Sequence, residues 1–243
     1  MTRTPVLLVH GIRLSSTCWV EVGEHLTPQR PVLAIDLPGH GARRGERFTL
    51  PGAVGAVRAG LDRLGGSALV VGHSLGGLTT IAAAAAHPDQ VAGVVLAGAT
   101  LVPGPALATP FRLMHRVLSS RPDGGQALSE KVFDRAVPPR VAAAIARGGI
   151  ATEVIPDVLA AVSGFDPVAA LATYPGPVRL INGGHDHFRL GEQRFVRACA
   201  NGRLLIVPRA GHYLPLTHAV TFADLVADFA AARDAAREIA SSH

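Results

Sequence analysis

Short apolar runs recur along the chain, and each is nearly continuous in apolar character rather than alternating with polar residues. The six runs are residues 6–9, 32–35, 68–71, 94–97, 178–181 and 204–207. Continuous runs of this length are typical of strands that are covered on both faces of a sheet. Several of these runs are separated by helix-length stretches, at residues 19–26, 50–64 and 78–87. Strands that alternate with helices predict a mostly parallel, doubly wound α/β sheet with helices on both faces.

One long interval breaks this alternation. From about residue 101 to residue 167 no strand-like run occurs, and the helical patterns at 111–118, 126–137 and 153–162 are interrupted by prolines and glycines. We expect an inserted helical cap, or lid, over the carboxyl edge of the sheet, where ligands bind in α/β domains. The predicted division is therefore a core domain made of residues 1–100 and 168–243, with residues 101–167 inserted into it.

Composition fits a soluble globular protein. Of the 243 residues, 48% are hydrophobic and 17% are charged, which argues against disorder and allows a sizeable core. The formal net charge is +5, but Lys131 is the only lysine and the arginines are scattered along the chain. Scattered arginines do not form the basic stripe that binds phosphates, so we expect no nucleic-acid partner.

The cysteines and the N-terminus bear on location. Cys18 and Cys199 have no metal-ligand or redox spacing, which argues against a disulfide framework. The first apolar run, Val6–Val9, is far too short for a signal peptide or a membrane span. The sequence thus predicts a cytoplasmic protein without a membrane partner.

A serine between glycines marks the candidate reaction centre. The segment Gly72-His73-Ser74-Leu75-Gly76 follows a buried strand and precedes a helical pattern. In such a G-x-S-x-G turn the serine stands on a strained strand-to-helix bend, and small residues are needed because strand and helix would otherwise collide. The turn lifts the hydroxyl clear of the sheet, so Ser74 is a candidate nucleophile.

A serine hydroxyl needs a base, and the base needs an orienting carboxylate. Asp186 lies in a loop just after the strand-like run 178–181, and His212 lies just after the last run, 204–207. The order serine, acid, histidine is the one expected for this turn geometry, and all three would emerge at the same edge of the sheet. The sequence therefore predicts a Ser74-Asp186-His212 triad.

An oxyanion formed on Ser74 would need preorganised N–H donors. The Leu75 N–H is one candidate because it lies at the start of a helix. The Ile12 N–H is a second, because it follows the His10-Gly11 pair in the loop after the first strand.

The chain resembles the α/β-hydrolase fold family over nearly its full length. The carrying motifs are His10-Gly11, 36-DLPGHG-41, 72-GHSLGG-77, 87-HPDQVAGVVLAG-98, 182-NGGHDH-187 and 210-AGHYLP-215. The resemblance implies that Ser74 is the nucleophile, Asp186 the acid and His212 the base, with Ile12 and Leu75 as the oxyanion hole. A serine at the turn disfavours the dehalogenase and epoxide-hydrolase branches.

Two departures from the family pattern stand out. The chain lacks an antiparallel hairpin before its first strand, so we expect about six strands. Asp186 lies between His185 and His187, but a metal pair there would lack a third ligand, and we expect no metal and no organic cofactor.

Neighbouring residues allow other interpretations. Asp36 is expected to brace a structural turn, His73 to pack beside the serine turn, and Trp19 to lie in the core. Arg13 could hold a substrate carboxylate, although a solvated surface arginine is the more common outcome. Phe111, Met114 and Phe133 could wall a substrate pocket or pack within the inserted segment.

The leading hypothesis is a serine hydrolase that cleaves a carboxylic ester, thioester or lactone with an apolar part through an acyl-enzyme on Ser74. The apolar part is suggested by the apolar residues of the inserted segment. The same triad could instead serve C–C bond hydrolysis, lyase chemistry or cofactor-free oxidation, because fold alone does not fix the reaction. A protein that only binds or senses a small molecule is a further alternative. The oligomeric state has no sequence signal.

Overall fold

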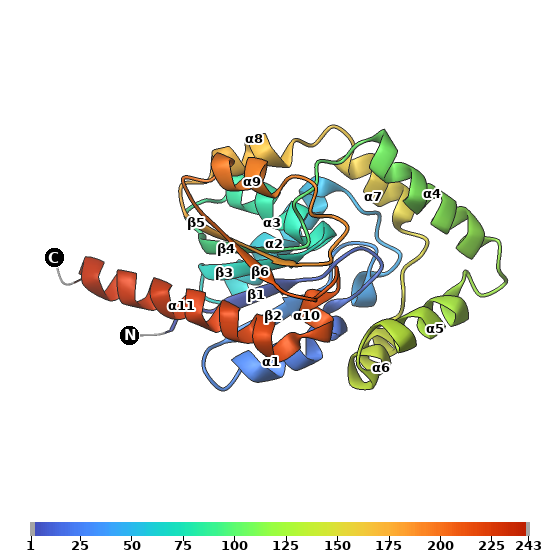
Figure 1. Ribbon diagram of the computed structural model, residues 1–243, viewed down its shortest axis with the longest axis horizontal. Coiled ribbons are helices and arrows are strands. Elements are labelled where there is room, and N and C mark those ends of the chain that lie inside the picture. The colour runs from blue at the N-terminus through green and yellow to red at the C-terminus, as the bar shows by residue number, and fades with distance from the viewer. Residues whose placement is uncertain (1–2, 242–243) are drawn as a thin grey trace.

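Six parallel strands form a single sheet in the computed structural model, which describes residues 3–241 (Figure 1). Their order across the sheet is β2-β1-β3-β4-β5-β6. Each predicted apolar run falls within one strand, so the predicted sheet of about six strands is confirmed. The strands are β1 (Val6–Val9), β2 (Val32–Ile35), β3 (Ala68–His73), β4 (Val91–Ala97), β5 (Pro177–Gly183) and β6 (Asn201–Val207).

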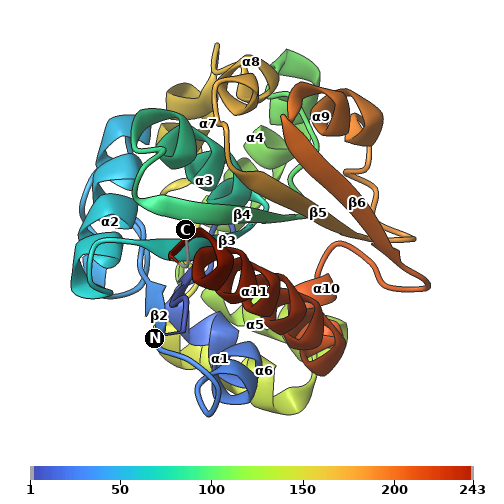
Figure 2. The ribbon, with the colours of Figure 1, turned by 90° about the vertical axis from the view of Figure 1, so that its left-hand side faces the viewer.

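Helices cover both faces of the sheet (Figure 2). One face carries the short 3₁₀ helix η1 (Ser16–Trp19), α1 (Val20–Leu26), α10 (Leu214–Thr217) and α11 (Ala219–Ser241). The opposite face carries α2 (Leu50–Arg63), α3 (Leu75–Ala86), α8 (Pro167–Ala172) and α9 (Glu192–Ala198). A further 3₁₀ turn, η2 (Gly41–Arg43), follows β2.

Burial explains why the central strands read as continuous apolar runs. All four residues of β1 and all six of β3 are buried, because each strand is covered above and below by helices. The edge strands β2 and β6 are more exposed. The middle of the sheet is therefore the rigid part of the core, and the segments with Ser74, Asp186 and His212 follow the carboxyl ends of β3, β5 and β6.

The long interval between β4 and β5 is helical, as expected, and contains no strand within residues 101–167. It comprises α4 (Pro105–Ser119), α5 (Gln126–Ala136), α6 (Pro139–Gly148) and α7 (Ile155–Val162). Helices α4 and α5 lie to one side of the sheet, with α7 packed against α4 and α6 packed against α5 and η1 (Figure 1). We refer to residues 101–167 as the inserted segment; its division from the core as a separate domain remains a prediction.

Helix α8 starts at the predicted boundary between the inserted segment and the core. It begins at Pro167, and Asp166 caps it by accepting hydrogen bonds from the N–H groups of Val168 and Ala169. Its neighbours are α3 and α9 on the sheet. Among residues 3–241 no helix is both long and apolar enough to cross a bilayer.

Candidate active site

Ser74 stands on the sharp turn between β3 and α3. Its backbone angles are φ 54° and ψ −116°, a region that a residue with a side chain rarely adopts and that stores strain. The flanking glycines are required by space, since a Cβ on Gly72 would collide with the Gly76 carbonyl and a Cβ on Gly76 would collide with the Val9 carbonyl. The strand, the turn and the helix can therefore approach closely only with glycine at both positions.

Two N–H groups lie beside this turn. Leu75 is the first residue of α3, so its N–H has no acceptor within the helix. The Ile12 N–H has no backbone acceptor among the hydrogen bonds of the described residues. The loop of Ile12 runs close to the turn, because a Cβ on Gly11 would lie 3.4 Å from the Ser74 Cβ. Both N–H groups border the turn without an acceptor in the backbone, and their role as oxyanion donors stays a prediction.

His10 fixes this loop, a role that the sequence analysis did not find. Its Nδ1–H donates to the Gly11 carbonyl oxygen at 2.8 Å, and its Nε2 accepts from the Leu37 N–H at 3.1 Å. Burial lowers the pKa of the His10 imidazole, so the ring stays neutral and can serve both contacts. The buried histidine thus ties the loop after β1 to the loop after β2.

Asp186 and His212 meet at the carboxyl ends of β5 and β6. The His212 Nδ1 lies 3.1 Å and 3.2 Å from the two carboxylate oxygens of Asp186. The Asp186 carboxylate also accepts from the Phe188 N–H at 2.8 Å. Burial alone would raise the pKa of Asp186, but the contact with His212 and the Phe188 N–H outweigh it and hold the pKa below its ordinary value. Asp186 is therefore a carboxylate that orients the imidazole.

A buried network behind Asp186 was not anticipated either. The Asn182 amide accepts from the Gly98 N–H at 3.0 Å and donates to Thr100 and Glu192. Glu192 pairs with Arg189, whose guanidinium also donates to the Gly184 carbonyl. These contacts link the end of β4 to the loop that carries Asp186.

His73 lies beside the turn, as expected, and is not a base. Its Nε2–H donates to the His212 carbonyl oxygen at 3.0 Å. Burial and the neighbouring His212 lower the pKa of His73 to about 3, so the ring is neutral. No hydrogen bond joins the Ser74 hydroxyl to His212 within the part of the chain that the structure describes. Both residues line the same cavity, and such contacts commonly tighten only when substrate binds.

Two cavities meet at Ser74. The first, of about 120 Å³, is lined mostly by apolar residues, and its only charged residue is the exposed Arg112. The second, of about 330 Å³, is also mostly apolar, but more titratable side chains line it, among them Arg13 and His212. The residues that line both are Ile12, Ser74, Phe111 and Phe188.

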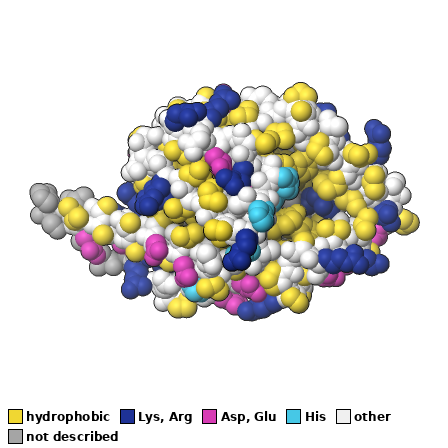
Figure 3. All heavy atoms as spheres, in the orientation of Figure 1, with side chains coloured by type: hydrophobic (Ala, Val, Ile, Leu, Met, Phe, Trp, Pro, Cys, Tyr) yellow, Lys and Arg dark blue, Asp and Glu magenta, His cyan; other side chains and the backbone are white. Residues whose placement is uncertain are grey.

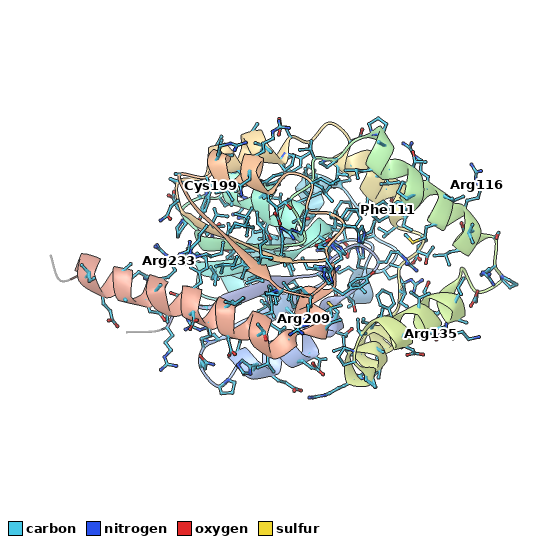
Figure 4. The ribbon with its side chains drawn as sticks, in the orientation of Figure 1. Phe111, Arg116, Arg135, Cys199, Arg209 and Arg233 are labelled. Atoms are coloured by element: carbon cyan, nitrogen blue, oxygen red, sulfur yellow. The ribbon has the colours of Figure 1, made fainter. Side chains whose placement is uncertain are left out.

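The inserted segment supplies part of these walls. Phe111 of α4 lines both cavities and lies on the side of the helix that faces the core, whereas Arg116 projects outward (Figure 4). Met114 of α4 and Phe133 of α5 line the second cavity, and Phe133 also packs with the core residues Val137 and Val141. The space between α4 and α5 is hollowed and largely apolar, with basic atoms visible inside it and histidine atoms at its edge (Figure 3).

The position of Arg13 differs from the one expected from the sequence. It is not a solvated surface arginine, because only 8% of its surface is exposed and its guanidinium contacts Ser129 and Thr152 of the inserted segment. The expectation was wrong because the partners lie 116 and 139 residues away, so no local pattern announces them. Arg13 lines the second cavity together with Ser74 and His212.

The remaining candidates have structural positions. Asp36 accepts hydrogen bonds from the N–H groups of Ser16 and Ala42, and so braces the turn after β2. Trp19 is 2% exposed and stacks near Phe222 in the core. His185 and His187 are both exposed, and His187 also lines the second cavity. No cluster of three or more potential metal ligands occurs among residues 3–241.

Comparison with known proteins decides the family. A sequence model described as the alpha/beta hydrolase family matches residues 6–225. The chain belongs to the alpha/beta hydrolase family. A pimeloyl-[acyl-carrier protein] methyl ester esterase of Neisseria meningitidis serogroup A is 31% identical over 251 residues, covering 92% of this chain and 76% of that protein. Family membership and these relatives make the protein an enzyme of the hydrolase class.

Other similarities are more local or more distant. Lipase LipV of Mycobacterium tuberculosis is 43% identical over 93 residues, which are 37% of this chain and 35% of the lipase. The crystal structure of an enol-lactonase from Burkholderia xenovorans superposes with a TM-score of 0.78, covering 94% of this chain and 92% of that one at 24% identity. A thermophilic esterase from Thermogutta terrifontis gives 0.79 at 22% identity, with 96% and 91% covered. The two structures share the fold of this α/β hydrolase.

Proposed function

We propose that this α/β hydrolase cleaves a carboxylic ester, thioester or lactone with an apolar part through an acyl-enzyme on Ser74. The observation that carries the proposal is that Ser74 and His212 line one cavity and that Asp186 contacts His212. Ser74 stands on a strained turn, His212 lines the same cavity, and the His212 Nδ1 contacts the buried carboxylate of Asp186. A hydroxyl, an imidazole and an orienting carboxylate are the groups that acyl transfer requires.

The reaction then proceeds in two halves. His212 takes the proton of the Ser74 hydroxyl while its oxygen attacks the carbonyl carbon, and the N–H groups of Ile12 and Leu75 stabilise the oxyanion. As the bond between the carbonyl carbon and the leaving group breaks, His212 returns the proton to the leaving atom. This atom is the oxygen of an alcohol or the sulfur of a thiol. Water, activated by His212, next attacks the acyl-enzyme and releases the acid and the free serine. Asp186 holds the imidazole in the tautomer with the proton on Nδ1.

The substrate class is supported from two sides. The first cavity is apolar, with Leu75, Leu78 and Val158 among its walls, and suits an aliphatic or aromatic group. Among the relatives, one is named for methyl ester cleavage and a structural neighbour is named an enol-lactonase. The inserted segment acts as a lid in this proposal, because α4 and α5 contribute walls of the second cavity.

The decisive experiment is intact-protein mass spectrometry after reaction with a fluorophosphonate. We expect one adduct on the wild type, none on Ser74→Ala and a strongly slowed reaction for His212→Ala. Ser163→Ala is the matched control, since this serine lines the first cavity away from the turn; it should label like the wild type. An ester and thioester panel should then show carboxylic acid release by the wild type.

Three results would contradict the proposal. Labelling that persists in Ser74→Ala would exclude this serine as the nucleophile. Labelling of Ser74 without turnover of any ester would favour a binding or sensing role, while turnover of a vinylogous diketone or a cyanohydrin without ester activity would favour C–C hydrolysis or lyase chemistry.

A further inference from the structure

Arg13 occupies a backbone position that does not favour an arginine. The Leu14 N–H donates to the Gly11 carbonyl oxygen at 3.3 Å and closes a tight turn around it. Within this turn Arg13 has φ 67°, in the left-handed region where glycine is the least strained residue. A side chain held at such a position generally offsets the backbone cost through its contacts, and strained residues of this kind cluster at functional sites.

The contacts of the guanidinium leave its charge without a partner. Within the described chain it donates to the hydroxyls of Ser129 and Thr152, and it approaches the Met114 sulfur at 3.6 Å. All three acceptors are neutral, and the Nε–H has no acceptor at all. Arg13 forms no ion pair with any described carboxylate. A buried charge that lacks a counter-charge is costly, and a ligand that brings one is bound strongly.

The nearby carboxylates already have other partners. Glu153, which follows Thr152 in the chain, pairs with Arg44 through both carboxylate oxygens. Asp186 faces His212. Burial lowers the pKa of the Arg13 guanidinium, and the neighbouring Tyr213 and Glu153 oppose this, but an arginine remains a cation at neutral pH. The positive charge therefore persists in the empty site.

The charge lies within reach of the reaction centre. Arg13 lines the second cavity together with Ser74, His212 and Tyr213, and it is the only Lys or Arg among the described residues that do so. Basic atoms are visible inside the hollow between α4 and α5 (Figure 3). One guanidinium matches one carboxylate in charge and in planar geometry, whereas a phosphate dianion would exceed the available positive charge.

The residues that line the two cavities indicate which half of the substrate would carry the carboxylate that pairs with Arg13. His212 lines the second cavity and not the first, and it must deliver its proton to the leaving oxygen. The leaving alcohol therefore lies in the second cavity, on the side of Arg13, and the acyl chain lies in the apolar first cavity. We propose that Arg13 determines specificity by binding a carboxylate on the alcohol part of the ester, which rests on the proposed function.

The reaction itself is unchanged by this contact. The bond between Ser74 Oγ and the carbonyl carbon forms, the bond from that carbon to the alcohol oxygen breaks, and the His212 proton goes to that oxygen. The carboxylate on the alcohol stays ionised throughout and leaves with the product. Arg13 acts by holding the alcohol part, so its effect is expected mainly in KM and in the choice between substrates.

A matched pair of substrates tests the proposal. The butanoate esters of γ-hydroxybutyrate and of γ-hydroxybutyramide have the same acyl group and nearly the same shape, and they differ by one negative charge. We expect the wild type to prefer the carboxylate ester by about tenfold or more in kcat/KM, since hydrogen bonds to charged groups are the strong ones. Arg13→Met should bring this ratio close to one, and Arg13→Lys should give an intermediate ratio because it keeps the charge without the planar fork.

The control variant locates the charge. Arg112→Met removes the arginine of the first cavity and should leave the wild-type ratio in place. A ratio that collapses in Arg112→Met and survives in Arg13→Met would overturn the proposal, as would a wild type that turns over both esters equally. If the wild type cleaves neither these two esters nor any member of the ester and thioester panel, the proposed function has failed; if it cleaves both esters without preference, only this inference has failed.

Binding provides a second readout, because Arg13→Met also loses the contacts to Ser129 and Thr152. In Ser74→Ala both esters can be titrated without turnover by isothermal calorimetry. The carboxylate ester should bind at least about tenfold more tightly, and added salt should weaken this preference only slightly since the charge is buried. Equal affinities of the two esters for Ser74→Ala would contradict the inference even if Arg13→Met does not fold.

Discussion

The carboxyl edge of the sheet and the inserted segment line the same cavities, but they are held in place differently. Every residue of β1 and β3 is buried, and the turn at Ser74 is fixed by glycines that touch backbone. Helix α4, by contrast, buries only Leu118 among its 15 residues, and Leu113 and Val117 are 59% and 47% exposed. The difference indicates that the candidate reaction geometry comes from the rigid region, whereas part of the cavity wall comes from a helix with a single buried side chain.

The hydrogen bonds of Arg13 also link the core to the inserted segment. They join the loop after β1 to Ser129 of α5 and to Thr152 before α7. Ser129 and Thr152 are themselves buried, so these bonds reach the well-packed part of the inserted segment. The guanidinium thus connects the edge of the sheet to the inserted segment at the cavity they share.

The largest expected effect comes from the rigid region. Asp186→Asn should lower kcat by about ten-thousandfold, because an amide cannot hold the His212 imidazole in the required tautomer. Its effect on stability should depend on pH. The pKa of Asp186 is lowered in the folded protein, so its charged form contributes stability above the unfolded-state pKa, and this contribution is lost as the pH falls through the folded-state pKa.

Chemical denaturation at several pH values checks the second half of this prediction. The difference in unfolding free energy between wild type and Asp186→Asn should be constant between about pH 6 and pH 8 and should shrink below about pH 4, near the ordinary aspartate pKa. A difference that grows on acidification would mean that Asp186 is not held as a stabilising carboxylate.

The next largest effect on stability is expected from substituting one glycine in each region. Gly76→Ala should cost about 3 kcal/mol or more, because the new Cβ would press on the backbone carbonyls of Val9 and His10, which cannot move independently. Gly104→Ala, just before α4, should change stability by less than about 0.5 kcal/mol, since a Cβ there meets nothing within 4 Å. Urea unfolding of both variants measures the contrast, and similar costs at the two positions would break it.

The smallest expected effect on stability comes from comparing a buried with an exposed leucine of α4. Leu118→Ala should cost about 2 kcal/mol, because Leu118 is the buried side chain of this helix. Leu113→Ala should stay within about 0.5 kcal/mol, because this leucine is mostly exposed. If the two substitutions cost the same in thermal or chemical unfolding, α4 is packed against something that covers Leu113.

Much of the rigid region could be predicted from sequence because its rules are local. An apolar run next to glycine, serine and a helical pattern specifies a strand, a turn and a helix within fifteen residues, and the loops with Asp186 and His212 follow from their strands. The roles of His10 and Asn182 and the burial of Arg13 could not be predicted this way. Each depends on partners from distant parts of the chain, as with Asn182 and Gly98, 84 residues apart, and no periodicity encodes such pairs.

The inserted segment leaves and re-enters the sheet between two neighbouring strands, since β4 ends at Ala97 and β5 begins at Pro177. Pairing these strands closes a long loop, and the entropy of closure grows only logarithmically with loop length. Doubling or halving the segment would change that term by only about 0.6 kcal/mol. The sheet can therefore accept segments of very different length at this point, so that one hydrolytic centre could be fitted with new substrate walls at little thermodynamic cost.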